Sequence, residues 1–199
     1  MQLCAITDRK RANQSLLSLV EGWSSGGVDF IQLREKDLDA SALQSLAREV
    51  LEKIDRNRTR LLVNISTPEA AALALEAGAD GVHLAGKPTW GAASRVREAI
   101  RRRRPVISVP CHRLEDVDVA YEEEVDLMLF SPVFEKVSGD GISVPQGLEG
   151  LRAACARARG IPVLALGGVT AGNAPDCLAA GAAGIAGIRL FAGHDWRRL

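Results

Sequence analysis

The sequence has few aromatic residues and no excess of either charge. Aromatic side chains make up 4% of its 199 residues, and 25 basic residues balance 25 acidic ones. So few rings argue against a platform on which nucleic-acid bases stack. A net charge of zero argues against binding to nucleic acid or to a membrane surface through overall charge. We therefore expect neither partner.

Long apolar runs and paired cysteines are also missing. No stretch of about 18 apolar residues could span a membrane, and no apolar signal region opens the chain. The four cysteines, Cys4, Cys111, Cys155 and Cys177, match neither a zinc pattern nor a Cys-x-x-Cys pair. We expect a cytoplasmic protein with free thiols and no bound metal.

Short apolar segments alternate with amphipathic segments rich in alanine and leucine. The predicted strands cover residues 3–7, 28–33, 60–64, 80–84, 106–109, 126–130, 162–166 and 183–187. The predicted helices cover about 13–25, 39–55, 67–77, 89–103, 113–123, 147–159 and 171–180. Eight strands separated by helices predict an α/β protein, a single-domain (β/α)₈ or TIM barrel over residues 1–193 with a C-terminal tail over 194–199.

An internal repeat supports the barrel. Similar phrases open every second predicted strand: Gly27-Val28-Asp29-Phe30, Gly78-Ala79-Asp80-Gly81, Glu124-Val125-Asp126-Leu127 and Gly181-Ala182-Ala183-Gly184. They recur about every 50 residues, the length of two strand–helix units. The repeat divides eight strands into four quarters, whereas a doubly wound sheet more often has five or six strands.

The last two predicted strands end in glycine. Gly167 and Gly168 follow one strand, and Gly187 and Ile188 end the other. Glycine lets backbone N–H groups approach a ligand closely, and the last two strands of a (β/α)₈ barrel often form a phosphate site. We predict that the backbone at these four residues forms a phosphate-binding site, the phosphate cup. Arg189 either adds a charged contact to this site or crowds it. The alternative is that these glycines only make tight turns.

Polar side chains follow the second predicted strand. Gln32 and Arg34 share the same parity along the strand, so both can point into the barrel mouth, and Lys36 continues the series. Two cations and an amide suit a phosphate or a pyrophosphate. The alternative is an exposed charged loop with internal ion pairs.

Three further polar residues end buried strands. Asn64 and His83 are placed for ligand contact, although His83 is also consistent with a structural histidine. His112 follows the fifth strand and is the best general acid or base in the chain, unless it only caps the next helix. Cys111 precedes it, but adjacent residues of an extended segment point apart, which argues against a Cys–His pair.

Two other segments suggest specific roles. The loop over 131–146 follows the sixth strand and is long and glycine-containing, which predicts a mobile lid over the site or, alternatively, a disordered insertion. The basic run over 101–104 ends a predicted helix on the opposite face of the barrel. Cations suit a helix C-terminus, so we interpret this run as a solvated helix end rather than a nucleic-acid site.

Several phrases in order resemble one family. They are Ala5-Ile6-Thr7-Asp8-Arg9, residues 31–36, Gly78-Ala79-Asp80-Gly81-Val82-His83-Leu84, Ser131-Pro132-Val133-Phe134, Gly147-Leu148-Glu149-Gly150-Leu151 and residues 164–169. Along nearly its full length the chain resembles the thiamine phosphate synthase/TenI superfamily. The resemblance implies a (β/α)₈ barrel that holds a thiazole phosphate at its C-terminal face, with backbone around Gly167, Gly168, Gly187 and Ile188 as the cup.

The resemblance implies two branches of activity. The synthases join a thiazole phosphate to a pyrimidine pyrophosphate, with magnesium and cationic groups stabilising the departing pyrophosphate. The TenI-like branch moves a proton to aromatise a carboxylated thiazole phosphate, using a histidine and no metal.

The sequence combines features of both branches. Gln32, Arg34, Lys36 and His83 are similar to the synthases. The acidic metal ligands of the synthases are missing, because Asn64-Ile65 and residues 85–88 stand in their places. Since Mg²⁺ in proteins usually needs one or two carboxylates, the loss is chemically significant.

Two more positions bear on the choice. In the lid, Lys136 and Ser138 offer only loose substitutes for the Thr- and Lys-bearing phrase of the synthases. His112 aligns with the acid/base histidine of the TenI-like branch. These departures favour the TenI-like branch.

We therefore expect a metal-independent thiazole tautomerase, an isomerase without a cofactor. His112 would move the proton, while Arg34 and Lys36 would face the substrate carboxylate. One alternative is a thiamine phosphate synthase, a transferase, that uses Mg²⁺ with Glu35 or Asp37 as relocated ligands. Another is a non-catalytic binder of thiazole phosphate. The expected partner is a small phosphorylated thiazole, and a homo-oligomer stays open.

Overall fold

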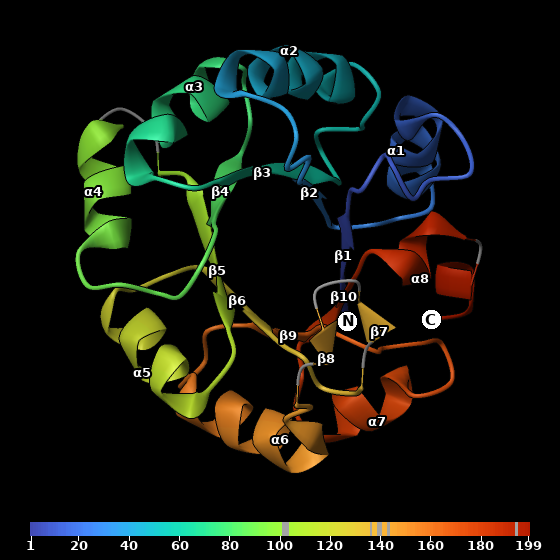
Figure 1. The fold of residues 1–199 in the computed structure, drawn as a ribbon, viewed down its shortest axis with the longest axis vertical. Coiled ribbons are helices and arrows are strands. Elements are labelled where there is room, and N and C mark those ends of the chain that lie inside the picture. Colours follow the sequence, from blue (N-terminus) through green and yellow to red (C-terminus); the bar gives the residue numbers. More distant parts are fainter. Residues whose placement is uncertain (101–103, 136, 139–140, 143, 194) are drawn as a thin grey trace.

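Eight parallel strands form a closed barrel, and helices surround it (Figure 1). The structure is a computed structural model that describes residues 1–100, 104–135, 137–138, 141–142, 144–193 and 195–199. The barrel strands are β1 (Gln2–Ile6), β2 (Phe30–Leu33), β3 (Arg60–Ile65), β4 (Gly81–Leu84), β5 (Val106–Cys111), β6 (Leu127–Phe130), β9 (Val163–Ala165) and β10 (Gly184–Gly187). Strand β1 pairs with both β2 and β10, which closes the ring. The predicted (β/α)₈ barrel is confirmed.

The helices follow the predicted order with shorter bounds. They are α1 (Leu16–Ser25), α2 (Ala40–Leu51), α3 (Ala71–Glu76), α4 (Ala92–Ala99), α5 (Leu114–Glu122), α6 (Gly147–Arg157), α7 (Ala174–Ala179) and α8 (Arg189–Ala192). The helix predicted over 67–77 begins as a 3₁₀ turn, η1 (Pro68–Ala70), and the residues 101–103 predicted to end another lie outside the described residues. Sequence analysis did not predict α8. No helix of the described part of the chain is long and apolar enough to cross a membrane.

Side-chain alternation along the strands produces two apolar cores. One fills the barrel interior and comprises Cys4, Ile6, Phe30, Leu62, Leu127, Leu129, Leu164 and Ala186. The other is a larger cluster, made of the alternate strand residues and the buried helix faces. Strands covered on both sides must be apolar on both sides, which explains their continuous hydrophobic runs.

The backbone conformation of the first residue explains part of the four-quarter repeat. Gly27, Gly78, Glu124 and Gly181 each follow an odd-numbered helix, and their φ angles are 88°, 101°, 53° and 102°. This left-handed conformation ends a helix and turns the chain into the next strand. Three quarters use glycine, which adopts positive φ at no steric cost, and the third uses Glu124.

The third residue of the repeat connects neighbouring strands. Its carboxylate accepts a hydrogen bond from a backbone N–H of the preceding strand: Asp29 from Leu3 (2.7 Å), Asp80 from Leu61 (2.8 Å) and Asp126 from Ile107 (2.9 Å). Ala183 occupies this position in the fourth quarter. The repeat therefore marks the end of the barrel opposite the functional face.

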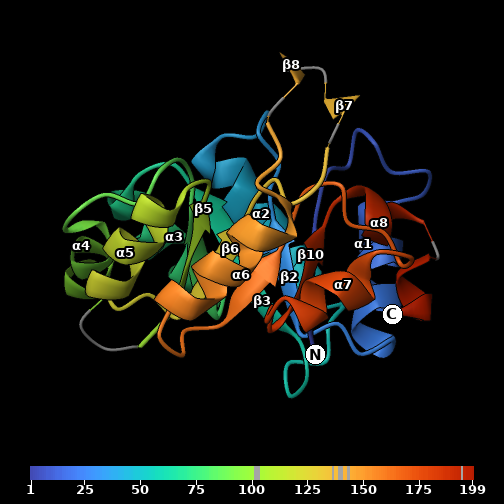
Figure 2. The same cartoon turned by 90° about the horizontal axis from the view of Figure 1, so that it is seen from below.

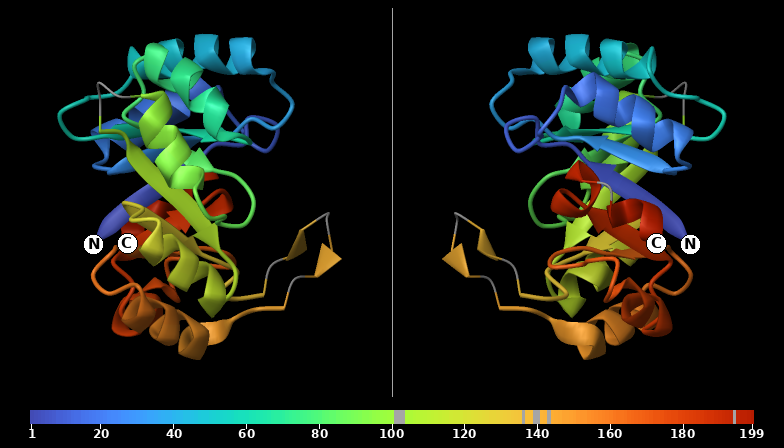
Figure 3. Two further views of the ribbon diagram at one scale, coloured as in Figure 1. Left: turned by 90° about the vertical axis from the view of Figure 1, so that its left-hand side faces the viewer. Right: turned by 90° about the vertical axis from the view of Figure 1, so that its right-hand side faces the viewer.

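The loop over 131–146 contains a short hairpin. Strands β7 (Val137–Ser138) and β8 (Gly141–Ile142) pair antiparallel and stand clear of the barrel at the end where the loops follow the strands (Figures 2 and 3). The predicted closure of this loop as a lid stays a prediction.

The C-terminal residues pack against the barrel. A 3₁₀ helix, η2 (Asp195–Arg198), buries Trp196, whose ring stacks on Phe191 with centroids 5.9 Å apart. The tail predicted over 194–199 thus contributes a core residue, although its two apolar residues, Trp196 and Leu199, are too few to predict this from sequence.

Candidate active site

A cavity of about 950 Å³ opens at the carboxyl ends of the barrel strands. Most of the predicted site residues line it: Gln32, Arg34, Lys36, Asn64, His83, His112, Gly167, Gly168, Gly187, Ile188 and Arg189. Lys136 and the side chain of Ser138 lie outside the described residues. Because the carboxyl ends of parallel strands meet at one face, residues from β2 to β10 converge there.

Polar side chains form the floor of this cavity. The amide nitrogen Nε2 of Gln32 donates to Oδ1 of Asn64 at 3.2 Å, and Nδ1 of His83 lies 2.9 Å from the hydroxyl of Ser108. Sequence analysis missed Ser108, although its parity in an apolar strand was a usable signal. Gln32 is 2% exposed, and its Oε1 has no hydrogen-bond partner among the described residues. A buried acceptor without a donor costs about 1–3 kcal/mol, so this oxygen suits a ligand N–H or O–H.

His83 is neutral in the folded protein. Burial lowers the pKa of His83 to about 3, and the charge of Arg34 and, when it is protonated, that of His112 add to the effect. Its hydrogen bond to Ser108 fixes the ring. His83 is therefore a neutral contact in the cavity wall, and proton transfer near pH 7 falls to another residue.

His112 is the exposed imidazole of the cavity. Its Nδ1 lies 2.8 Å from the carbonyl oxygen of Ser131. Because a carbonyl only accepts, Nδ1 carries the proton in this contact, and Nε2 of the neutral ring, which has no hydrogen-bond partner in the described part of the chain, is an acceptor. The start of α5 is capped by Asp116, its third residue, which accepts from the backbone N–H groups of His112 and of the N-cap residue Arg113 at 2.8 and 3.0 Å. The side chain of His112 is thus not needed to cap the helix.

Cys111 does not pair with His112. It is fully buried in the outer apolar core. Burial, with the nearby charge of Asp116, raises the pKa of Cys111 to about 12. A thiol of that pKa is protonated at neutral pH, so it is no nucleophile.

The glycines after β9 are required by their backbone. Gly167 and Gly168 have φ of 90° and 68°, and a Cβ on either would lie 2.7 Å from a neighbouring atom of the loop after β6. Within the described part of the chain, the N–H groups of Gly167, Gly168 and Ile188 meet no hydrogen-bond acceptor. Free N–H groups facing a cavity suit an anion. Arg189 is exposed beside them, which fits an added cation better than a side chain that fills the cup.

Two cations from the β2 loop face the same cavity. Arg34 and Lys36 line it, and neither side chain makes an ion pair with any described residue. Charges that sequence analysis missed also reach the cavity, from Glu135 and from the C-terminal pair Asp195 and Arg198, whose ion pair measures 3.8 Å. Nothing in the sequence placed η2 at the mouth.

Fold and cavity together define a (β/α)₈ barrel whose candidate active site lies at the C-terminal face. A family model described as thiamine monophosphate synthase (TMP-TENI) matches residues 3–191. The chain therefore belongs to this family of thiamine-biosynthesis barrels.

Individual relatives agree with the family match. The chain is 43% identical over 187 residues to "Putative thiamine-phosphate synthase" of Geobacter sulfurreducens, which covers 92% of this chain and 83% of that one. It is 34% identical to the thiamine-phosphate synthase of Mycolicibacterium smegmatis, with 98% and 86% covered. The solved thiamine phosphate pyrophosphorylase of Pyrococcus furiosus superposes with a TM-score of 0.79 at 26% identity, covering 99% of this chain and 90% of that one.

The cavity does not offer a magnesium site of the usual kind. In the described part of the chain, no three His, Cys, Asp or Glu side chains are grouped to hold a metal ion. Strands β3 and β4 end in Ile65 and Leu84, which are buried apolar residues of the outer core. Glu35 and Asp37, the relocated ligands of the synthase alternative, are bound by Arg9 and Lys10. With Asp195 paired to Arg198, Glu135 is the one carboxylate of the cavity lining without an ion pair among the described residues, so the lining offers Mg²⁺ a single free carboxylate and no grouped ligand set.

Proposed function

We propose that this protein binds a phosphorylated thiazole in the cavity and moves a proton on it without a metal, as a thiazole tautomerase. The observation that carries the proposal is His112, whose Nδ1 is held by Ser131 while its Nε2 has no hydrogen-bond partner in the described part of the chain; the pairing of Glu35 and Asp37 with Arg9 adds to it. The N–H groups of Gly167, Gly168 and Ile188 would bind the phosphate. Arg34 and Lys36 would face the substrate carboxylate.

The chemistry needs only one proton-carrying group. Nε2 of His112 takes a proton from one carbon of the substrate and returns it to another, so the ring becomes aromatic and no co-reactant is consumed. Positioned acid–base catalysis of this kind contributes about 10²–10⁴-fold in rate. Ser131 keeps the imidazole in the tautomer that begins as a base.

The names of the relatives favour a second function, thiamine phosphate synthase. They support this alternative more directly than they support a tautomerase. The cavity floor agrees with it in one respect, since the unpaired Oε1 of Gln32 suits an amino group such as that of a pyrimidine. The pairing of Glu35 and Asp37, the relocated ligands of this alternative, with Arg9 argues against it.

One set of assays separates these functions. We expect wild-type protein to tautomerise a carboxylated thiazole phosphate in the presence of a chelator. We expect His112→Ala to lower that rate by about 10²–10⁴-fold, with the Kd for thiazole phosphate unchanged. Calorimetry measures the Kd, and substrate absorbance follows the rate.

Two results would contradict the proposal. The first is equal tautomerisation by His112→Ala and wild type. The second is Mg²⁺-dependent formation of thiamine phosphate from both substrates without tautomerisation, which would establish the synthase. Binding without either turnover would establish a non-catalytic binder.

A further inference from the structure

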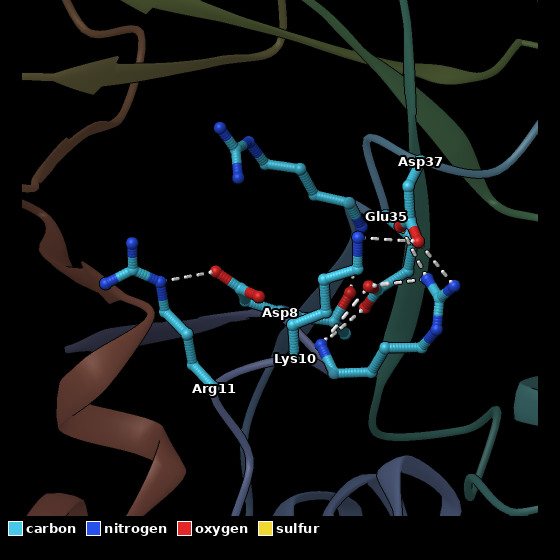
Figure 4. A network of polar contacts seen from close by, with 8 residues as sticks. Asp8, Lys10, Arg11, Glu35 and Asp37 are labelled. Carbon is cyan, nitrogen blue, oxygen red and sulfur yellow. Dashed lines mark hydrogen bonds and ion pairs between the residues drawn. The ribbon is translucent and has the colours of Figure 1, made fainter. Parts of the chain in front are cut away.

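Charges alternate along the loop that follows β2, in the order Arg34, Glu35, Lys36, Asp37. Without other partners, neighbouring side chains of opposite charge would form ion pairs with one another. In the structure the two acidic residues turn instead toward the loop that follows β1, where Figure 4 shows Glu35 and Asp37 beside Lys10.

Glu35 is held by Arg9 through main chain and side chain. The backbone N–H of Arg9 lies 3.1 and 3.2 Å from the two carboxylate oxygens, and its Nη1 donates to Oε2 at 3.1 Å. The Glu35 side chain is only 2% exposed. A buried carboxylate needs such partners, because an unpaired one is strongly destabilising.

Asp37 is held by the same arginine and by a lysine. Nη1 and Nη2 of Arg9 each donate to one Asp37 oxygen at 2.8 Å, and Nζ of Lys10 lies 3.0 Å from Oδ2. The hydrogen bond from Lys10, with that from Arg9, holds the pKa of Asp37 below its usual range. One guanidinium therefore bridges both carboxylates of the alternating stretch.

Barrel closure brings the two loops together. Strands β1 and β2 are parallel neighbours, with Ile6 opposite Gln32. The backbone N–H of Thr7 donates to the carbonyl of Gln32 at 3.0 Å, and the Thr7 hydroxyl accepts from the N–H of Arg34 at 2.9 Å. Thr7 is fully buried, so these bonds fix the point where Arg34 leaves the strand.

The two basic residues of the stretch take no part in these ion pairs. Arg34 and Lys36 line the cavity, and their side chains have no ion-pair partner in the described part of the chain. We propose that Arg9 is a positioning residue. By holding Glu35 and Asp37, together with Lys10, it keeps these carboxylates from pairing with Arg34 and Lys36, so that the two cations stay available for an anionic ligand. We call Arg9, Lys10, Glu35 and Asp37 the Arg9 clip. The proposal rests on the proposed function only in that Arg34 and Lys36 contact an anion.

Anion binding tests the clip without any turnover. The probe is inorganic pyrophosphate, titrated calorimetrically in metal-free buffer at low ionic strength. We expect Arg9→Gln to weaken binding about tenfold, because two released carboxylates then compete for Arg34 and Lys36. We expect Arg9→Gln/Glu35→Gln/Asp37→Asn to restore the wild-type Kd within about twofold, because the competing charges are gone.

Arg11→Gln is the matched control. Arg11 lies in the same loop but pairs with Asp8 at 3.0 Å, so its loss should leave the Kd unchanged. Arg34→Gln/Lys36→Gln should abolish the binding. Circular dichroism and thermal melting verify the fold of each variant. If Arg9→Gln alone unfolds, the triple variant still provides a test, because it contains no unpaired buried carboxylate.

The outcomes distinguish the clip from the proposed function. Wild-type affinity in Arg9→Gln, with binding lost in Arg34→Gln/Lys36→Gln, overturns the clip alone. Failure of the folded triple variant to recover affinity shows a merely structural role and also overturns it. If Arg34→Gln/Lys36→Gln binds pyrophosphate as tightly as wild type does, this result contradicts both the clip and the role of these cations in the proposed function. Failure of the His112 test, with the clip variants behaving as expected, overturns only the tautomerase.

Discussion

Two histidines at the mouth of the barrel lie in different surroundings. His83 and His112 both line the cavity, yet one is buried and neutral while the other is exposed with a free Nε2. The sequence predicted that both residues reach the mouth, since strand parity and strand ends are local properties. It also predicted His112 as the acid–base group, which stays a prediction, but it did not predict the burial of His83 or the partners Ser108 and Ser131, which come from other strands.

The depressed pKa of His83 predicts a pH dependence of stability. Its pKa is about 3 in the folded protein and about 6.5 in the unfolded chain, so between these values the unfolded chain binds more protons. The free energy of unfolding should therefore fall as the pH drops below about 6.5, with this residue adding a slope of up to about 1.4 kcal/mol per pH unit. Urea titrations between pH 4 and 8 measure it.

His83→Gln should flatten that slope, while His112→Gln, at the exposed histidine, should leave it in place. An identical slope in wild type and His83→Gln would show that His83 is not the titrating group.

Among the elements, the odd-numbered helices and the strands after them show why the repeat exists. A left-handed residue ends the helix, and an aspartate at the start of the next strand accepts an N–H from the neighbouring strand. The sequence predicted the repeat and its period, because both are visible in the residues themselves. It also predicted the ends of the odd-numbered helices to within one residue, whereas α2 and α4 end four residues inside the predicted bounds, since the amphipathic pattern continues past the last helical turn.

Removing one of these aspartates should destabilise the barrel. Asp80→Ala leaves the N–H of the buried Leu61 without its acceptor, which should lower the free energy of unfolding by about 1–3 kcal/mol. Asp80→Asn keeps an acceptor oxygen and should lose less. Chemical denaturation measures both.

Asp118→Ala is the comparison at an exposed ion pair with Arg157, which should change stability by less than about 1 kcal/mol. Equal losses at Asp80 and Asp118 would contradict the role given to the strand-opening aspartate.

In the molecule as a whole, the C-terminal segment closes the outer core. Trp196 is 4% exposed and stacks on Phe191, which in turn meets Trp23 of α1 edge-on at 6.4 Å. Residues from both ends of the chain therefore share one aromatic cluster. A single tryptophan near the end gave no periodic signal from which this packing could be predicted.

Trp196→Ala should destabilise the whole barrel by about 3–5 kcal/mol, the usual cost of truncating a buried aromatic side chain. Trp90 is 64% exposed, so Trp90→Ala should cost far less and is the matched control. Thermal melting followed by circular dichroism compares them. Similar melting temperatures for the two variants would mean that the C-terminal segment is dispensable for stability.

The sequence by itself determined the elements of this protein and the face where they act. Apolar runs, helical periodicity and strand-end residues are local patterns, and parallel strands necessarily bring Gln32, Arg34, Asn64, His83 and His112 to one end of a barrel. Only the tertiary structure decided which side chains are partners: Gln32 with Asn64, His112 with Ser131, and Glu35 with Arg9. These pairs join different strands or the loops after them, so strand register and the paths of the loops determine them. That is why the sequence located the cations of the mouth, while the fold decided that Glu35 and Asp37 are paired with Arg9.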